Sequence, residues 1–413
     1  MFLSLIFFVL IGIGSGIVLG LLPGAHVNNI LPLILALTVS FSSPYCLAVF
    51  IVALALTQIF ISFIPSVFLG APEADTSLSV LPGHRLLLEG RGYEAIKLTV
   101  VGGICSLLLS LVLISALANY FTFLYKISRP YIQYAILLVI IFMIFSEKKL
   151  KKMLSAVLIV ILSGFLGILT LGSSIVPQQN VLFPVLSGLF GLSTIIVSMG
   201  QRSKLPKQKE EDRIMVKKKD LMKSILLGSF AGIIVGFLPA IGVSQAAVMV
   251  QSLAGMGETR SFLVTLSGIN TANEVFSLSS LYLVNNPRSG ASVAIGRILQ
   301  EVSFNEMVLL IGVICFTAGI ASLVTLYLGK KIPKFLVRLN YRYLCFTVIL
   351  FLIIMVFFIT GVYGLLILFT STSIGLLAVN LGIKRSHCMG CLLIPSLLFF
   401  SGVNPFVLTT LRI

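Results

Sequence analysis

The sequence is poor in charge: only 10% of its 413 residues are Asp, Glu, Lys or Arg, whereas 58% are hydrophobic. Soluble globular domains carry about 25% charged residues, so this scarcity excludes an ordinary soluble protein. Long apolar runs are present instead, such as Ala95–Leu117, Tyr343–Thr360 and Gly361–Val379. Each approaches the roughly 20 residues that a helix needs to cross a bilayer. The sequence therefore predicts an all-α polytopic membrane protein with roughly 10 to 14 membrane segments.

Residues that usually build catalytic and metal centres are also scarce. The three histidines, His26, His84 and His387, lie far apart along the chain, and no pair of carboxylates accompanies them. Among six cysteines, only Cys388 and Cys391 form a CxxC pair, whereas a structural zinc site needs four ligands. The sequence thus disfavours an enzyme, and it predicts neither a metal site nor an organic cofactor.

The basic residues indicate how the chain meets the membrane. The first apolar run, residues 1–22, has no Lys or Arg before it, and a signal peptide needs a basic start. We therefore expect this run to be retained as a helix. The net charge of +16 comes from basic residues that concentrate in short loops between apolar runs. This follows the positive-inside rule, so the predicted partner is the lipid bilayer and not nucleic acid.

One charged segment divides the chain. Gln201–Lys223 holds nine basic and four acidic residues and no apolar run. It is predicted to be a basic cytoplasmic linker, residues 201–223. An N-terminal membrane repeat, residues 1–200, would precede it, and a C-terminal repeat, residues 224–413, would follow it.

The two halves resemble each other. A shift of 216 residues pairs GIVLGLLP with GIIVGFLP, so that Pro23 falls on Pro239. A shift of 212 pairs Glu94 with Glu306, and a shift of 211 pairs Pro184 with Pro395. Three anchors at nearly constant offset indicate an internal duplication.

Loop charges predict the orientation of the two repeats. Residues 118–131 carry two basic residues and their counterpart, 329–342, carries five. Residues 147–152 carry four lysines, whereas the turn around Gly361 has none; residues 172–180 have none, whereas their counterpart carries Lys384 and Arg385. The bias reverses at all three loops, which predicts inverted-topology repeats.

Each half opens with a broken helix. GLLPGAHVNN interrupts the first apolar run at Pro23, and FLPAIGVSQ interrupts the corresponding run at Pro239. Proline and glycine break a helix, and inside a membrane the freed backbone groups must meet protein or a water-filled cavity. Paired breaks at equivalent positions are typical of a transporter binding site. The alternative is a pair of proline kinks lined by small residues for helix packing.

The helix after each break begins with free N–H groups that carry partial positive charge and suit an anion. The residues in these first turns can donate hydrogen bonds and add no negative charge. The loop 284–297 adds an arginine, whose fork matches a carboxylate or phosphate; the alternative is an incidental surface arginine. The predicted substrate-binding residues are Gly24, His26, Asn28, Asn29, Gly242, Ser244, Gln245, Arg288 and Ser289.

A carboxylate lies near the middle of the apolar segment Arg260–Leu283. Placing the charged Glu274 there would cost free energy, since insertion scales give about +2.5 to +3.5 kcal/mol for a charge at the centre of a membrane helix. We predict that Glu274 couples transport to an ion gradient, together with Asn270, Thr271 and Asn273. These oxygens suit Na⁺, or the carboxylate carries H⁺. The alternative is a glutamate paired with a buried arginine in a structural role.

The doubled GxxxGxLP motif, FIPSVFLGAPEADTSLSVLPGHRLLLEGRGYEAIKLTVVGG and LFPVLSGLFGLSTI resemble the large permease subunit of the tripartite tricarboxylate transporter family. PGAHVNN and NNPRSGAS resemble its short, archaeal-type branch. The resemblance implies import of carboxylates driven by an ion gradient. It also implies a small membrane subunit and an extracytoplasmic binding protein as partners.

The predicted function is that of a secondary active transporter permease in the cell membrane. It would move a small organic anion of the carboxylate type, with Na⁺ or H⁺ as the coupling ion. The alternative is a flippase for a polyprenyl-phosphate or another anionic lipid, because the same helix-end site suits a lipid phosphate. A channel is disfavoured, since broken repeats suit alternating access better than a continuous pore.

Overall fold

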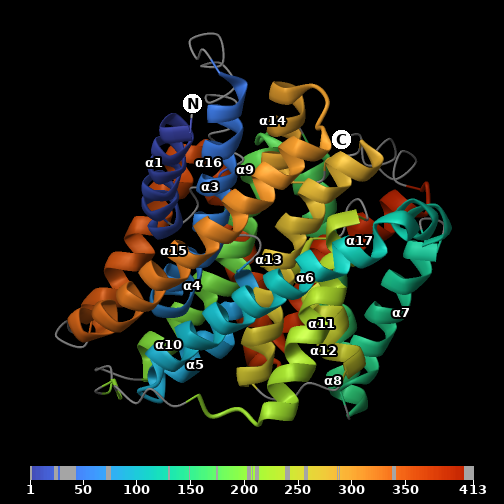
Figure 1. The fold of residues 1–413 in the computed structure, drawn as a ribbon. Coiled ribbons are helices and arrows are strands. Elements are labelled where there is room, and N and C mark those ends of the chain that lie inside the picture. Colours follow the sequence, from blue (N-terminus) through green and yellow to red (C-terminus); the bar gives the residue numbers. More distant parts are fainter. Residues whose placement is uncertain are drawn as a thin grey trace.

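The computed structural model describes residues 2–22, 27, 43–70, 76–128, 131–147, 149–173, 175–201, 206, 208–209, 214–237, 242–254, 259–285, 287, 289–336 and 341–403. Over these ranges the chain is helical and forms no strand, which confirms the predicted all-α class (Figure 1).

The first half contains short irregular helices between long ones. Its elements are α1 (Phe2–Leu21), α3 (Pro44–Ile61), α4 (Phe63–Leu69), the 3₁₀-helix η2 (Ser77–Ser79), α5 (Val80–Leu88), α6 (Gly92–Ser128), α7 (Ile132–Phe145), α8 (Leu150–Gly172), α9 (Gln178–Leu186), the π-helix η4 (Ser187–Leu192) and α10 (Ser193–Gln201).

The second half has an equivalent order with fewer breaks. Its elements are α11 (Lys218–Phe237), α12 (Val243–Ala254), α13 (Thr259–Val284), α14 (Gly290–Leu299), α15 (Phe304–Leu336), α16 (Tyr341–Asn380), the 3₁₀-helix η5 (Arg385–Met389) and α17 (Gly390–Phe400).

Seven of the described helices or helix pairs are long and apolar enough to cross a membrane, so the chain is a multi-pass membrane protein. With 20 and 26 residues, α11 and α13 are also long enough, but they are more polar. The predicted 10 to 14 segments are reached only when these two helices and the three shorter apolar helices are also counted, which brings the total to twelve.

Each half opens with two helices that pack closely at glycines. On α1, Gly12 lies against Phe50 and Ala53, Gly16 against Leu54 and Thr57, and Gly20 against Ile61 of α3. On α11, Gly228, Gly232 and Gly236 lie in the same way against α13. Both sequences read GxxxGxxxG, a spacing that lets helix backbones approach closely. In both pairs, the residue numbers of the contacts increase in the same direction along the two helices, so the helices run parallel.

The equivalent helices of the two halves run in opposite directions. At the end of the molecule that carries the linker, Glu94 at the start of α6 binds Arg260 at the start of α13, with an N–O distance of 2.8 Å. At the other end, Glu306 at the start of α15 accepts a hydrogen bond from Tyr45 at the start of α3. Figure 1 accordingly shows α1 entering from the upper end and the chain before α11 running along the lower end. The predicted inverted topology is therefore confirmed.

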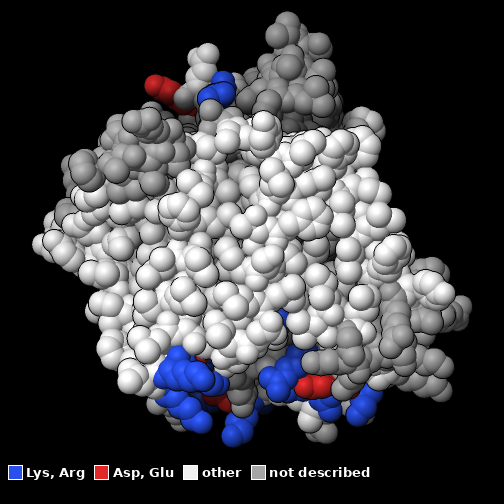
Figure 2. Space-filling model, turned by 180° about the vertical axis from the view of Figure 1, so that it is seen from behind, with Lys and Arg blue, Asp and Glu red and all other residues white. Residues whose placement is uncertain are grey.

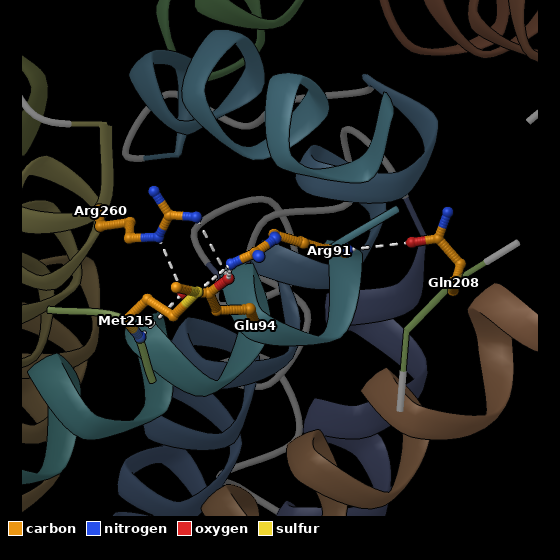
Figure 3. Close-up of polar contacts among 6 residues, drawn as sticks. Arg91, Glu94, Gln208, Met215 and Arg260 are labelled. Carbon is orange, nitrogen blue, oxygen red and sulfur yellow. Dashed lines mark hydrogen bonds and ion pairs between the residues drawn. The ribbon is translucent and has the colours of Figure 1, made fainter. Parts of the chain in front are cut away.

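Part of the linker docks on the first half. Glu94, with a side chain only 5% exposed, also bonds Arg91 at 3.3 Å and accepts the Met215 amide at 3.1 Å (Figure 3). Gln208 accepts the Gly92 amide at 3.0 Å. This clasp joins the starts of α6 and α13 to the segment before α11, so the described part of the linker is not freely solvated.

On the face that Figure 2 shows, the charged side chains gather at the ends of the molecule. Figure 2 shows Lys and Arg gathered at the lower end, where the linker runs, below a broad uncharged band. This distribution agrees with the loop bias in the sequence, and it makes the linker end the predicted cytoplasmic end.

A single glycine divides α16 into two arms. The helix has 40 residues, and Gly361 adopts φ 68° and ψ −162° inside it. A continuous helix of this length would measure about 60 Å, roughly twice the thickness of the hydrocarbon core of a bilayer. Glycine adopts a positive φ at little energetic cost, so it can break the helix here. The break lies between the two apolar runs that the sequence predicts as separate spans.

We expect Gly16→Ala to destabilise the protein. A Cβ at Gly16 would lie 2.6 Å from the Leu54 carbonyl oxygen and 2.7 Å from the Thr57 Cβ, and overpacking of this kind costs about 1–3 kcal/mol. Gly14→Ala on the same helix is the matched control, because nothing lies within 4 Å of its added Cβ. The unfolding temperature in detergent should fall for the first variant only; an equal change in both would contradict this packing.

Candidate functional site

The first broken segment is held by a buried amide side chain. Pro23, Gly24, His26, Asn28 and Asn29 lie outside the described residues, but Val27 is described. Its N–H donates to Oε1 of Gln58 on α3 at 2.9 Å, and Gln58 is 2% exposed. A backbone donor released by the break is therefore satisfied by the neighbouring helix, as the membrane interior requires.

The second broken segment leads into α12. Pro239 lies outside the described residues, whereas Gly242 accepts the Ala246 amide at 3.1 Å and Ser244 is buried in the first turn. Gln245 lies in the same turn. The helix contacts both η2 of the first half and η5 of the second. The start of α12 therefore belongs to a region where irregular segments from both halves meet.

Two predicted residues from different segments come together at the tip of α14. The Ser289 hydroxyl donates to Oε1 of Glu274 at 3.2 Å. Ser289 also caps α14 by accepting the Ser292 amide at 3.1 Å. Glu274 stands about 22 Å along a helix of about 39 Å, near its middle, so its carboxylate faces the positive end of α14. Arg288 lies outside the described residues.

The other predicted coupling residues divide between two faces of α13. Asn270 is buried one turn before Glu274, so the two share a face, and half-buried Asn273 lies beside it. Thr271 faces α6 instead, where its hydroxyl donates to the Gly103 carbonyl at 2.8 Å. The structure thus brings Asn270 and Glu274 together and uses Thr271 for helix packing.

A pair of matching hydroxyl clusters was missed from sequence. In the second half, the Ser277 and Ser292 hydroxyls lie 2.9 Å apart, and Ser292 donates to the Ser289 carbonyl. In the first half, the Ser66 and Ser79 hydroxyls lie 2.8 Å apart, and Ser79 donates to the Thr76 carbonyl. The shared S/T-x-x-S spacing is the only sequence signal for them. Each half therefore places buried hydroxyls at the start of a short helix, α5 or α14.

A loop of the first half holds the segment that follows α16. Oε1 of Glu147 accepts the Lys384 amide at 3.0 Å and lies 3.2 Å from Nε2 of His387. Burial lowers the pKa of His387 below its ordinary value, and the bond to Glu147 offsets this only in part. Burial would raise the pKa of Glu147, but the hydrogen bonds from Lys384 and His387 outweigh it, so that pKa is also lowered.

These two shifts predict that acid destabilises the folded protein, because it places a positive charge on the buried His387 imidazole. Both groups bind protons less tightly when folded, so their stabilisation is complete above about pH 6.5, the ordinary histidine value, and falls as the pH drops. The unfolding temperature should therefore fall between pH 7.5 and pH 5.5, and by less in His387→Gln. The exposed carboxylate variant Glu89→Gln is the control and should keep the full pH dependence. Equal pH dependence in wild type and His387→Gln would rule this contact out as a source.

Comparison with known proteins finds matches that extend over nearly the whole chain. The family model described as tripartite tricarboxylate transporter TctA family matches residues 6–390. The uncharacterized protein MJ1079 of Methanocaldococcus jannaschii is 31% identical over 407 residues, which covers 95% of this chain and 98% of that protein. No solved structure matches.

Proposed function

Since the chain belongs to the tripartite tricarboxylate transporter TctA family, we propose that it is a secondary active permease for a small organic anion with carboxylate groups. The transported anion would bind between the two inverted halves. The observation that carries this proposal is the pair of hydroxyl-lined helix starts, one from each half, in the protein interior.

The helix starts supply the chemistry that an anion needs. Buried serine hydroxyls, Ser79 directly before α5 and Ser292 in the first turn of α14, lie beside the partial positive charge of a helix N-terminus. The start of α12 adds Gly242 and Ser244 from the second break. Binding at the junction of inverted repeats allows either half to open while the other stays closed.

Ion coupling is proposed for the tip of α14. Glu274 lies near the middle of α13, bonds Ser289 and shares a helix face with Asn270. Carboxylate, amide and hydroxyl oxygens are suitable ligands for Na⁺, and a carboxylate in this setting also suits proton transfer. In the first half Ile59 occupies the position of Glu274 when α3 and α13 are aligned on their glycine contacts. One coupling site is therefore proposed, not two.

Partner subunits are proposed from the family. A small membrane subunit and an extracytoplasmic binding protein would complete a tripartite transporter. Binding to the permease itself can be measured without these partners, which makes a stability assay the suitable first test.

We expect carboxylates to raise the unfolding temperature of the purified protein. A ligand at about 100 times its Kd stabilises the folded state by about 2.7 kcal/mol. Citrate, succinate and acetate would be compared in NaCl and in choline chloride, for wild type and Glu274→Gln. Stabilisation should be greater with Na⁺, and this increment should vanish in Glu274→Gln. The exposed variant Glu301→Gln is the matched control and should behave as wild type.

Two results would contradict the proposal. Stabilisation by a polyprenyl phosphate alone, indifferent to Na⁺ and to Glu274→Gln, would assign the protein to lipid translocation. Stabilisation by carboxylates that is equal in NaCl and choline chloride at every pH would exclude ion coupling through Glu274.

A further inference from the structure

One arginine is buried where the two halves meet. Arg385 begins η5 and is 9% exposed. Its Nη1 donates to the hydroxyls of Ser193, at 3.3 Å, and Thr194, and its Nη2 donates to the Ser193 carbonyl at 3.4 Å. All three acceptors are uncharged. No Asp or Glu among the described residues forms an ion pair with it.

A buried cation of this kind needs an explanation. Removing an unpaired ion from water costs several kcal/mol, and hydrogen bonds to two hydroxyls and a carbonyl offset only part of that. The guanidinium has five N–H donors in a fixed fork, and it forms three hydrogen bonds to acceptors in the described part of the chain. Donors therefore remain for a further acceptor, and a carboxylate matches the fork in both charge and geometry.

The partners of Arg385 follow an irregular helix. The π-helix η4 ends at Leu192, immediately before Ser193 and Thr194. Such segments occur frequently at functional sites, because they redirect side chains. The π-helix η4 contacts η2, which carries Ser79 of the first-half hydroxyl cluster, and α5, which begins directly after it. Arg385 thus stands beside one of the two proposed anion-binding helix starts.

Among the described residues, the surroundings of Arg385 add no compensating negative charge. His84 on α5 lies close enough to feel its charge, and burial lowers the pKa of His84 to about 4, with Arg385 acting in the same direction. His84 is therefore neutral at physiological pH. The helix η5 that begins with Arg385 also contacts α12, which follows the second break.

We propose that Arg385 binds a carboxylate group of the transported anion, with the Ser193 and Thr194 hydroxyls beside it. This rests on the proposed function and adds to it the residue that recognises the negative charge. The residue aligned with Arg385 at the offset of 211 is Ser174, so only the second half supplies this cation. The substrate class that follows is a carboxylate anion, bound by charge as well as by hydrogen bonds.

The test measures carboxylate binding to Arg385→Gln, Arg385→Lys and the control Arg85→Gln. Arg85 has a side chain 72% exposed that pairs with Glu89. Citrate and succinate would be titrated against the unfolding temperature of each purified protein. Arg385→Gln should raise the apparent Kd at least roughly 30-fold, since losing one partner of a buried charge contact costs that much or more. Arg385→Lys should retain the fold but bind more weakly, because it lacks the fork.

The stability of the ligand-free proteins separates a binding role from a structural one. If Arg385 serves to bind an anion, ligand-free Arg385→Gln should unfold at the same temperature as ligand-free wild type or higher. The reason is that the substitution removes a buried charge that has no compensating partner until the anion binds. A lower temperature without ligand, together with unchanged carboxylate affinity, would overturn the inference. Should Arg385→Gln fail to fold, wild-type affinity for carboxylates in Arg385→Lys would overturn the inference as well.

The failure of the proposed function can be told apart from the failure of this inference. If no carboxylate stabilises wild type, both fail. If carboxylates stabilise wild type and Arg385→Gln equally, only this inference is overturned.

Discussion

The structure depends on the burial of a polar helix, α13, between two helices that approach it through small residues. On one side Gly102 and Gly103 of α6 allow Ser267 and Thr271 to donate to the Thr99 and Gly103 carbonyls. On the other side Gly228, Gly232 and Gly236 bring α11 into contact. Hydroxyls that would be costly in lipid are satisfied by neighbouring backbones. This environment keeps Glu274 inside the protein and away from the acyl chains.

The two inverted halves share a similar framework of helices, and these two frames differ in the charges that they carry. Both contain a glycine-packed helix pair, a glutamate at the start of the following long helix and a hydroxyl cluster at the tip of a short helix. The second-half cluster lies beside the anion Glu274, whereas the first-half cluster lies near the cation Arg385. Equivalent clusters in a symmetric scaffold thus lie near charged groups of opposite sign.

Much of this architecture could be predicted from residue patterns, and the exceptions have a common cause. Apolar runs, the reversal of loop charge and Gly361 predicted the spans, the inversion and the turn in α16 correctly. Hydropathy undervalues α13 because its surroundings are protein, so polar side chains there meet partners instead of lipid. Gln58, Ser66 and Arg385 carry no local signal of their role, since their partners lie far away in sequence. Thr271 was grouped with Glu274 by proximity in sequence, but the helix turns its side chain toward α6.

The sequence by itself determined the class of protein, the division into two halves and their opposite orientation, because hydrophobic length and basic loops act locally and additively. It also located Glu274 and the paired helix breaks as candidates. Only the tertiary structure decided which polar groups meet: Glu274 with Ser289, Val27 with Gln58, and Arg385 with Ser193. Those contacts join segments separated by 15 to 192 residues, and their energies depend on burial that arises only when both halves pack together.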